Sequence, residues 1–254
     1  MITNSQSGTN IEEIAAGIFR INTPFQEIPG GFSFNQYLVV DDEPLLFHTG
    51  MRRMFPLVSE AIGRVINIEK LRYVAFSHFE SDECGALNHF LAEAPNAIPL
   101  CSRIAALVSV NDYADRPPKA MADGERLSIG KREFVWIDAA HIPHGWETGY
   151  LFDATTRTLF SGDIFTQGGL GREAVIEDDL VEPSDAFRVG FSKHAGLPDS
   201  WAHTSDSEPV IEKLASLGAT TIANMHGSCW RGSSDTAASM LRELARRVAA
   251  PPSD

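Results

Sequence analysis

The sequence predicts a mixed α/β (α+β) protein in which two β-sheets pack together and helices cover the outer side of each sheet. Short β-like runs dominate the first 50 residues, and helical and strand patterns alternate from residue 54 to about residue 110. Two hairpin patterns and a helix–strand–helix order complete the chain. Because these patterns form two loosely similar halves without a linker between them, we expect a single domain over residues 1–254.

The composition restricts the class of partner. The chain has 43% hydrophobic and 22% charged residues, which is enough apolar material for a sizeable core. Its formal net charge of −13 argues against nucleic acid, since phosphate binding needs a basic face, and against an anionic membrane surface. No apolar run reaches the roughly 18 residues of a membrane helix. The N-terminus lacks the basic and apolar regions of a signal peptide, and three irregularly spaced cysteines suggest a reduced compartment. We therefore expect a cytoplasmic protein.

The first part of the chain predicts an antiparallel meander. Residues 1–10 are expected to be disordered. Strands are expected over residues 14–21, 32–40 and 44–50, because these runs are rich in β-branched and aromatic residues and are separated by turn residues. The acidic run at residues 41–43 is a plausible hairpin turn between the last two strands.

The middle of the chain predicts alternating helices and strands. Residues 54–66 and 84–94 have apolar residues at helical spacing, and the apolar run at residues 71–76 between them is typical of a buried strand. A short strand is expected over residues 97–100, followed by a helix that Ser102 caps and that extends to about residue 110.

The last part returns to β-structure and ends in helices. Residues 165–205 are rich in Gly, Pro and acidic residues, so we expect an irregular active-site segment with one short helix near residues 184–189. The remaining expected elements are hairpins over residues 126–129 with 133–137 and 149–153 with 158–161, helices over 210–217 and 236–248, and a strand over 220–224.

The polar stretch after the strand at residues 71–76 predicts a metal site. Alternate side chains of an extended backbone point to the same face, so His78, Glu80 and Asp82 are expected to converge. One imidazole and two carboxylates at this spacing are typical metal ligands. Taken alone, the stretch is equally consistent with an ordinary polar loop.

Three further candidates follow predicted strands and favour the metal site. They are His144, Asp163 and His226, and small residues beside each of them let the backbone bend and approach closely. A lone histidine in such a place is more often structural than a ligand, and His141 is a rival to His144. Four strand ends in this chain carry suitable donors, which is hard to attribute to coincidence. A binding module without metal is therefore a poor explanation of the pattern.

The order His-x-Glu-x-Asp…His…Asp…His resembles the metallo-β-lactamase-fold superfamily over most of the chain. The usual motif has a second histidine where this chain has Glu80. In this respect the chain resembles the flavodiiron branch and its stand-alone relatives, the oxygen-binding diiron proteins. The resemblance implies an αβ/βα four-layer sandwich. It also implies one iron held by His78, Glu80 and His144, a second held by Asp82 and His226, and Asp163 as the bridge between them.

Position 83 departs from the resemblance, because most relatives have a histidine there. Glu83 either binds the second metal through a carboxylate oxygen or turns away and leaves that metal more open. We include it among the metal ligands, and we expect Asp82 and Glu83 to act in catalysis. His144 is preferred to His141 because its surroundings align in position with the corresponding region of the family.

The donor types favour two iron ions. Carboxylates and imidazoles together suit iron or manganese, whereas thiolate-rich or three-histidine sets suit zinc, so zinc and manganese are the substitutes to consider. The resemblance then implies dioxygen binding or slow dioxygen reduction, in oxygen sensing or oxygen-linked redox chemistry. We expect no flavin domain in this chain, so rapid turnover would need an external electron donor; a signalling partner and a homodimer stay open.

The alternative is a dinuclear hydrolase in which a metal-bridging hydroxide attacks an ester, thioester or lactone carbonyl and Asp82 steers the water. Glu80 weighs against this alternative, since hydrolytic relatives usually have histidine at its position.

Overall fold

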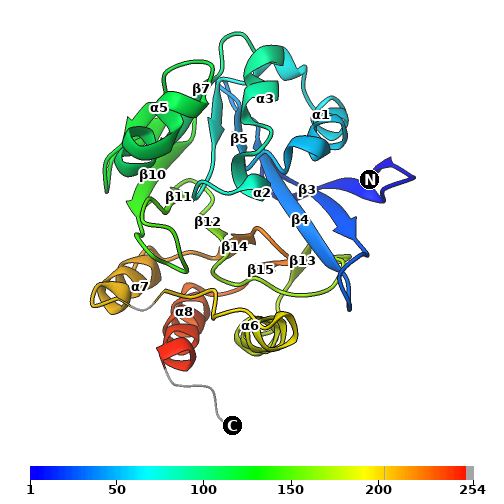
Figure 1. Ribbon diagram of the computed structural model, residues 1–254. Coiled ribbons are helices and arrows are strands. Elements are labelled where there is room, and N and C mark those ends of the chain that lie inside the picture. Colours follow the sequence, from blue (N-terminus) through cyan, green and yellow to red (C-terminus); the bar gives the residue numbers. More distant parts are fainter. Residues whose placement is uncertain (203, 250–254) are drawn as a thin grey trace.

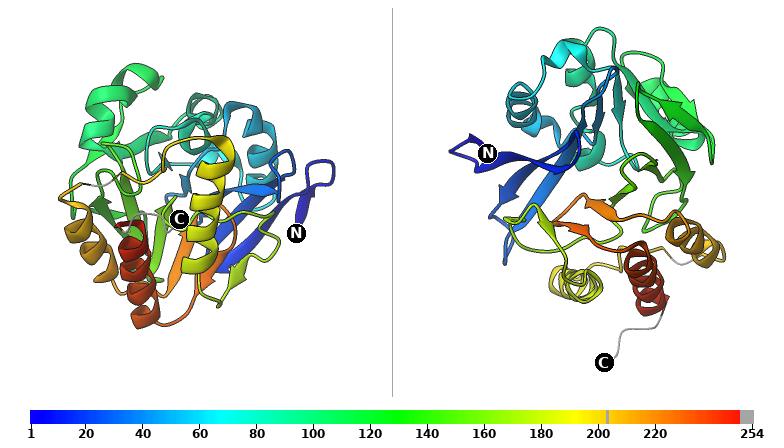
Figure 2. Two further views of the ribbon diagram at one scale, coloured as in Figure 1. Left: turned by 60° about the horizontal axis from the view of Figure 1, so that its bottom comes forward. Right: turned by 180° about the vertical axis from the view of Figure 1, so that it is seen from behind.

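Two β-sheets packed face to face form the centre of the molecule, and helices lie on the outer side of each (Figure 1). The computed structural model describes residues 1–202 and 204–249. The first sheet has eight strands in the order β1-β2-β3-β4-β5-β6-β7-β8, and the second has seven in the order β13-β15-β14-β12-β11-β10-β9. Figure 2 shows the same layers from two further sides. This arrangement confirms the expected αβ/βα sandwich.

The first sheet changes from antiparallel to parallel along its width. Strands β1 to β5 pair antiparallel, which confirms the expected meander, and β5 to β8 pair parallel. The strands are β1 (Ile2–Asn4), β2 (Thr9–Ala15), β3 (Ile18–Phe25), β4 (Phe32–Val39), β5 (Leu45–Phe47), β6 (Tyr73–Ala75), β7 (Ile98–Ser102) and β8 (Lys119–Met121).

Helical segments connect the parallel strands of the first sheet. They are η1 (Arg52–Met54), α1 (Phe55–Ile62), η2 (Ile68–Lys70), α2 (Ser81–Cys84), α3 (Leu87–Glu93), α4 (Arg103–Ala105), the π-helical turn η3 (Ala106–Val110) and α5 (Asn111–Tyr113). Ser102 caps α4 as expected, because its Oγ accepts a hydrogen bond of 3.0 Å from the N–H of Ala105.

The second sheet contains both expected hairpins. Its strands are β9 (Arg126–Ser128), β10 (Glu133–Asp138), β11 (Gly149–Asp153), β12 (Thr158–Gly162), β13 (Val175–Ile176), β14 (Thr221–Asn224) and β15 (Cys229–Arg231). Strands β12 and β14 pair parallel, so the loops that follow them leave the same edge of the sheet. The covering helices are α6 (Val181–Ala195), α7 (Ser207–Ala215) and α8 (Ser234–Ala249).

Three apolar layers hold the sandwich together. In β4, Leu38 packs toward α1 and α3, whereas Tyr37 and Val39 point to the other sheet. This alternation follows from the two-residue period of a strand. In β12, Leu159 packs toward α7 and α8 and Phe160 packs between the sheets. Because both faces of these strands are buried, apolar residues occupy consecutive positions in them, as in Tyr37–Val39 and Leu159–Phe160.

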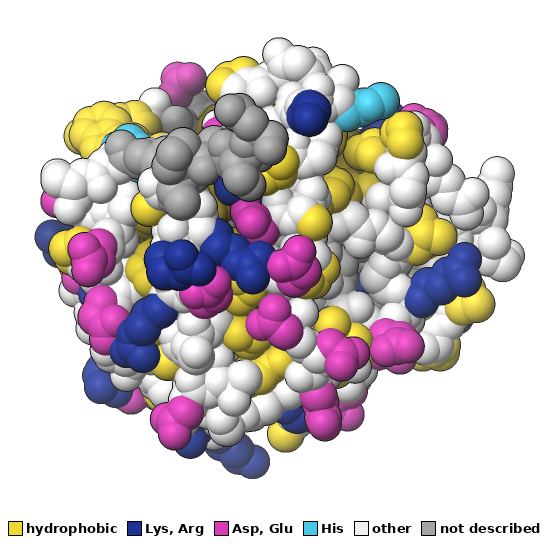
Figure 3. Space-filling model, turned by 90° about the horizontal axis from the view of Figure 1, so that it is seen from below, with side chains coloured by type: hydrophobic (Ala, Val, Ile, Leu, Met, Phe, Trp, Pro, Cys, Tyr) yellow, Lys and Arg dark blue, Asp and Glu magenta, His cyan; other side chains and the backbone are white. Residues whose placement is uncertain are grey.

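The outer face of α6 to α8 carries mixed charge. Figure 3 shows acidic and basic side chains interspersed on this side of the molecule. Arg242 pairs with Glu212, and Arg247 pairs with Glu182 and Glu243. Within residues 1–202 and 204–249, every helix is too short or too polar to cross a lipid bilayer.

The expected disorder of residues 1–10 is wrong. Strand β1 pairs with β2, and the N-terminal ammonium donates to the carbonyl of Ile11 at 2.8 Å. Thr9 Oγ1 lies 3.1 Å from Thr23 Oγ1 on the neighbouring strand. Because the polar side chains of this segment find partners across the sheet, its polarity did not indicate disorder.

The expected irregularity of residues 165–205 is wrong over residues 181–195. The expected short helix is the fifteen-residue α6. Its buried face includes Ser184 and Arg188, and the Arg188 guanidinium bonds to Asp185 at 2.7 Å and to Asp199. Polar contacts take the place of an apolar stripe, so helical periodicity was absent from the sequence. His203 in this segment lies outside the described residues.

Candidate metal centre

The candidate site lies where loops from the two sheets meet. His78 follows β6 of the first sheet, whereas Asp163 follows β12 and His226 follows β14 of the second. His144 lies in the loop between β10 and β11. The fold therefore brings the four strand-end candidates of the sequence to one place.

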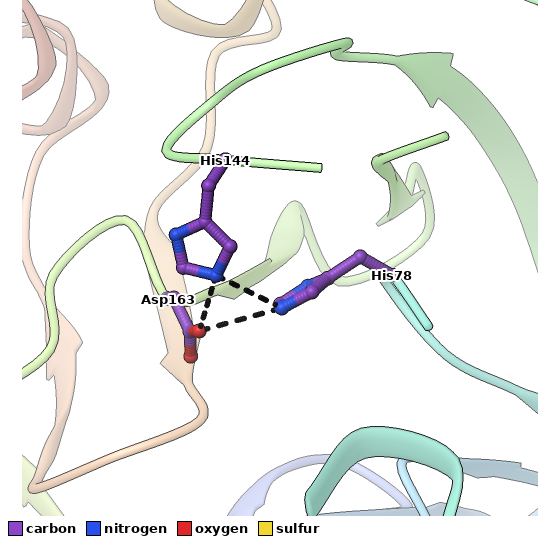
Figure 4. A group of neighbouring side chains, drawn as sticks. All are labelled: His78, His144 and Asp163. Atoms are coloured by element: carbon purple, nitrogen blue, oxygen red, sulfur yellow. Dashed lines mark hydrogen bonds and ion pairs between the residues drawn. The ribbon is translucent and has the colours of Figure 1, made fainter. Parts of the chain in front are cut away.

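One group of donors surrounds what we call the first ion position. His78 Nε2 and His144 Nε2 lie 3.2 Å apart, and each lies 3.6 Å from Asp163 Oδ2 (Figure 4). Glu80 Oε1 lies 3.3 Å from His144 Nε2 and 3.7 Å from His78 Nε2. Donors that each lie about 2.1 Å from one ion are separated by roughly 3–4 Å, so His78, His144 and Asp163 fit a single cation, and Glu80 lies at similar distances from the two imidazoles.

A second group faces the other oxygen of Asp163. His226 Nε2 lies 3.3 Å from Asp163 Oδ1 and 3.5 Å from Asp82 Oδ2. We call this the second ion position. Because Oδ2 of Asp163 faces the first position and Oδ1 faces the second, its carboxylate lies between the two, as a bridge does.

Backbone carbonyls fix the orientation of two histidines. His226 Nδ1 lies 2.8 Å from the carbonyl oxygen of Ser33, and His144 Nδ1 lies 3.0 Å from that of Ser200. A carbonyl only accepts, so Nδ1 carries a proton in both rings, and Nε2 is the nitrogen that can bind a cation once it has released any proton of its own. This is the arrangement that partners of metal-binding histidines normally produce.

A buried serine orients the third histidine. Ser77 Oγ lies 3.0 Å from His78 Nδ1 and 3.0 Å from His48 Nε2. Burial lowers the pKa of His48 to about 3, so its imidazole is neutral and can accept the Ser77 hydroxyl proton. Ser77 then accepts from the Nδ1–H of His78, which leaves His78 Nε2 free to bind a cation.

Replacing Ser77 by alanine is expected to weaken divalent-metal binding by roughly 10- to 100-fold, because His78 Nδ1 loses the acceptor that fixes its tautomer. Zn²⁺ titration against a chromophoric chelator measures the change. The exposed Ser128→Ala variant is the matched control, and equal affinities for the two variants would contradict the role of Ser77.

Two glycines permit the close approach of the loops. Gly162 has φ 48°, and a Cβ on it would lie 2.9 Å from Ser77 Oγ. Gly227 has φ 82°, and a Cβ on it would lie 2.7 Å from Gln167 Cβ. Both positions exclude a side chain, which confirms the expectation that small residues flank the candidate ligands.

The imidazoles and carboxylates shift one another's pKa values. His144 and His78 lower the pKa of the Glu80 carboxyl to about 2. Burial acts against protonation of His144, but Glu80 and Asp163 outweigh it and raise the pKa of His144 to about 9. Burial also opposes the low pKa of Asp163, which His226 and the other two imidazoles bring about. Each shift reports a strong field between closely packed, opposite charges.

Glu83 is the most buried carboxylate of the site. Its side chain is 0% exposed, and among the described residues neither of its oxygens has a hydrogen-bond partner. Burial, together with the nearby carboxylates of Asp163 and Asp82, raises the pKa of Glu83. An unpaired buried carboxylate is unfavourable unless a proton or a cation compensates it. A site built for cations supplies that compensation.

Within the part of the chain that the structure describes, the seven predicted ligands thus all lie in clusters of potential metal ligands, whereas the rival His141 does not. Clusters of potential metal ligands contain His78, Glu80, Asp82, Glu83, His144, Asp163 and His226. His141 belongs to none of the clusters found among the described residues. Sequence reasoning missed the orienting partners: Ser77 was detectable only as the neighbour of His78, and a backbone carbonyl such as that of Ser33 leaves no sequence signal.

The chain is similar to several known proteins. The model of the family described as ODP family beta lactamase matches residues 32–227. The chain is 30% identical over 208 residues to the rubredoxin-oxygen oxidoreductase of Megalodesulfovibrio gigas, a match that covers 80% of this chain and 50% of that protein. It is 26% identical over 208 residues to the anaerobic nitric oxide reductase flavorubredoxin of Salmonella arizonae, covering 79% of this chain and 42% of the relative. The chain spans half or less of the length of these relatives.

Solved structures share the fold. The rubredoxin oxygen:oxidoreductase of Desulfovibrio gigas superposes with a TM-score of 0.79 at 22% identity, covering 93% of this chain and 61% of that one. The flavodiiron protein of Giardia intestinalis gives a TM-score of 0.76 at 18% identity, covering 94% and 59%. At these identities the likeness shows a common architecture.

Proposed function

The chain belongs to the ODP family of β-lactamase-fold proteins, in the flavodiiron branch, and from this membership we propose that it is a diiron oxidoreductase that binds and reduces dioxygen. In this proposal, His78, Glu80 and His144 hold the iron at the first ion position. Asp82 and His226 hold the iron at the second, and Asp163 bridges the two.

The placement of Asp163 carries the proposal. Its Oδ2 faces His78 and His144 at 3.6 Å, and its Oδ1 faces His226 at 3.3 Å. A carboxylate with separate nitrogen donors at each oxygen is arranged to span two cations about 3.5–4 Å apart. The carboxylate oxygens of Glu83 also support a dinuclear site. They are buried without hydrogen-bond partners among the described residues, and two bound cations would offset the cost of burying their charge.

The donor set favours iron. Glu80, Asp82, Glu83 and Asp163 bring four carboxylates to three imidazoles, and this mixture of oxygen and nitrogen donors suits iron or manganese better than zinc. Four negative charges also neutralise two divalent cations. Zinc and manganese are therefore outcomes that metal analysis must distinguish from iron.

The chain's own residues define how a small substrate reaches the site. When bound, two ferrous ions would supply two electrons, enough to reduce one dioxygen with two protons to hydrogen peroxide, and two further electrons from an external donor with two further protons would complete reduction to two water molecules. Glu80 is 51% exposed and His144 is 26% exposed, whereas His78 and His226 are almost fully buried. Substrate would thus enter beside Glu80 and His144, and the buried side excludes water.

The electrons would come from a donor outside the described residues. Two relatives carry the names rubredoxin-oxygen oxidoreductase and flavorubredoxin, which support a donor of the rubredoxin or flavin kind. We propose such a donor as the redox partner.

Metal affinity is expected to rise with pH between pH 7 and pH 9. The pKa of His144 is about 9 without metal, so at pH 7 its Nε2 holds a proton that a cation must displace. Well below this pKa, one displaced proton changes the apparent affinity by about tenfold per pH unit, and the slope flattens near pH 9, so the change over this range is about 50-fold. Co²⁺ titrations at several pH values measure the slope, and a His144→Ala variant should show a flatter one. A pH-independent wild-type affinity would contradict this expectation.

Single-turnover mixing tests the proposed function. Anaerobically prepared ferrous protein, freed of excess reductant, is mixed with dioxygen in one arm and with nitric oxide in another. We expect consumption of about one dioxygen per two irons and a ferric visible spectrum. If the protein consumes nitric oxide but not dioxygen, nitric oxide is the substrate in place of dioxygen. A colourless zinc protein that cleaves a thioester and consumes neither gas would overturn the proposal in favour of the hydrolase.

A further inference from the structure

Glu83 is placed to serve both ion positions. One cluster of potential ligands joins it to His78 and Glu80, and another joins it to Asp82 and His226. In each cluster the donor atoms lie within 4.8 Å of one another, and Glu83 Oε1 lies 3.8 Å from His78 Nε2. Glu83 thus lies within 4.8 Å of potential donor atoms from both groups.

The backbone holds Glu83 in this place. Its carbonyl oxygen accepts from the N–H of Thr49 at 2.7 Å and from Thr49 Oγ1 at 3.3 Å, which ties α2 to the segment after β5. The side chain is fully buried, and among the described residues both of its oxygens are free of hydrogen-bond partners. Two oxygens without protein partners, pointing into a set of metal-ligand side chains, are available for two cations.

We propose that Glu83 is a second carboxylate bridge, which binds one iron through each oxygen, so that Glu83 and Asp163 together span the pair. This inference rests on the proposed dinuclear site. A histidine at this position binds one metal ion only, whereas a carboxylate has two oxygens and can bind two. A second bridge adds a negative charge shared by both ions, so we expect it to favour their ferric state and lower the reduction potential of the pair.

The test separates the two ion positions. A His226→Ala background leaves the first position intact, and a His144→Ala background leaves the second. Glu83→Gln, which keeps the shape but removes the charge, is added to each background and to the wild type, and Glu93→Gln on the exposed end of α3 is the matched control. Fe²⁺ and Co²⁺ titrations against a chromophoric chelator measure the affinities, and circular dichroism of the metal-free proteins checks the fold.

A bridge predicts that Glu83→Gln weakens binding at both positions, each by at least about tenfold. It also predicts that Glu83→His recovers affinity in the His144→Ala background but not in the His226→Ala background, because an imidazole binds one ion. In the otherwise wild-type protein, Glu83→Gln should raise the midpoint potential of the iron pair.

Two results would overturn the bridge while leaving the dinuclear site intact. If the Glu83→Gln variant binds both ions like wild type, Glu83 is a neutral structural acid. If the variant weakens binding at the second position only, Glu83 is a ligand of one ion. A wild-type protein that binds fewer than two ions would instead remove the proposed function and the bridge together.

Discussion

Asp163→Asn is expected to reduce iron binding from about two ions per chain to fewer than one, with affinity lowered by more than about 100-fold at both positions. In the structure, Oδ2 faces His78 and His144 and Oδ1 faces His226. An amide keeps one oxygen but replaces the other by an NH₂ group, which has no lone pair for a cation. It also removes the charge that both ions share.

The fold is not expected to depend on this carboxylate. The main chain around it is held by its own bonds, such as that from the N–H of Met225 to the carbonyl of Gly162 at 2.9 Å. Circular dichroism of the metal-free variant should therefore match that of the wild type, while iron analysis and chelator competition report the loss. Asp178→Asn on the exposed surface is the matched control. A variant that keeps two tightly bound irons would contradict the bridging role of Asp163.

Asp153→Ala is expected to lower the free energy of unfolding by about 3–5 kcal/mol. Asp153 is fully buried at the end of β11, and one of its carboxylate oxygens accepts from Arg132 Nη1 at 2.5 Å and from Thr156 Oγ1 at 2.8 Å. The Arg132 guanidinium also donates to the carbonyl of Ala16 in the first sheet, so this ion pair ties the two sheets together. Removing the carboxylate leaves a largely buried guanidinium without its counter-charge.

An exposed ion pair gives the matched control. Glu212 accepts two hydrogen bonds from Arg242 on the outer face of α7 and α8, and Glu212→Gln should change stability only slightly, because solvent screens an exposed pair. Urea unfolding of both variants with a chelator present separates this effect from metal binding. If Asp153→Ala costs no more than Glu212→Gln, the pair does not stabilise the contact between the sheets.

The sequence predicted the parts of the fold that have a strong period. Strands β4, β6, β10 and β12 and helix α8 lie where apolar periodicity placed them. The short strands β8, β13 and β15 were missed, because their two or three residues show no alternation and, unlike β6, do not lie in a longer apolar run. Helix α6 was predicted too short, because Arg188 and its acidic partners take the place of an apolar stripe.

The candidate ligands were predictable because their chemistry is visible in residue types. His78, Glu80 and Asp82 share a motif, and the distant candidates each follow a predicted strand. The groups that orient them were less visible, because the carbonyls of Ser33 and Ser200 belong to the backbone. The burial of Glu83 between two donor groups needed the structure, since sequence spacing does not specify which way a side chain turns within a four-residue helix.

Mössbauer spectroscopy of ⁵⁷Fe-loaded wild-type protein, with iron and zinc analysis of the same sample, tests the claim that this protein holds a dinuclear iron centre. Two carboxylate-linked ions held by the seven candidate ligands should give about two irons per chain, and after exposure to air a ferric pair coupled to a diamagnetic ground state. A single iron per chain, two magnetically independent irons, or a protein that retains zinc in place of iron would contradict the claim.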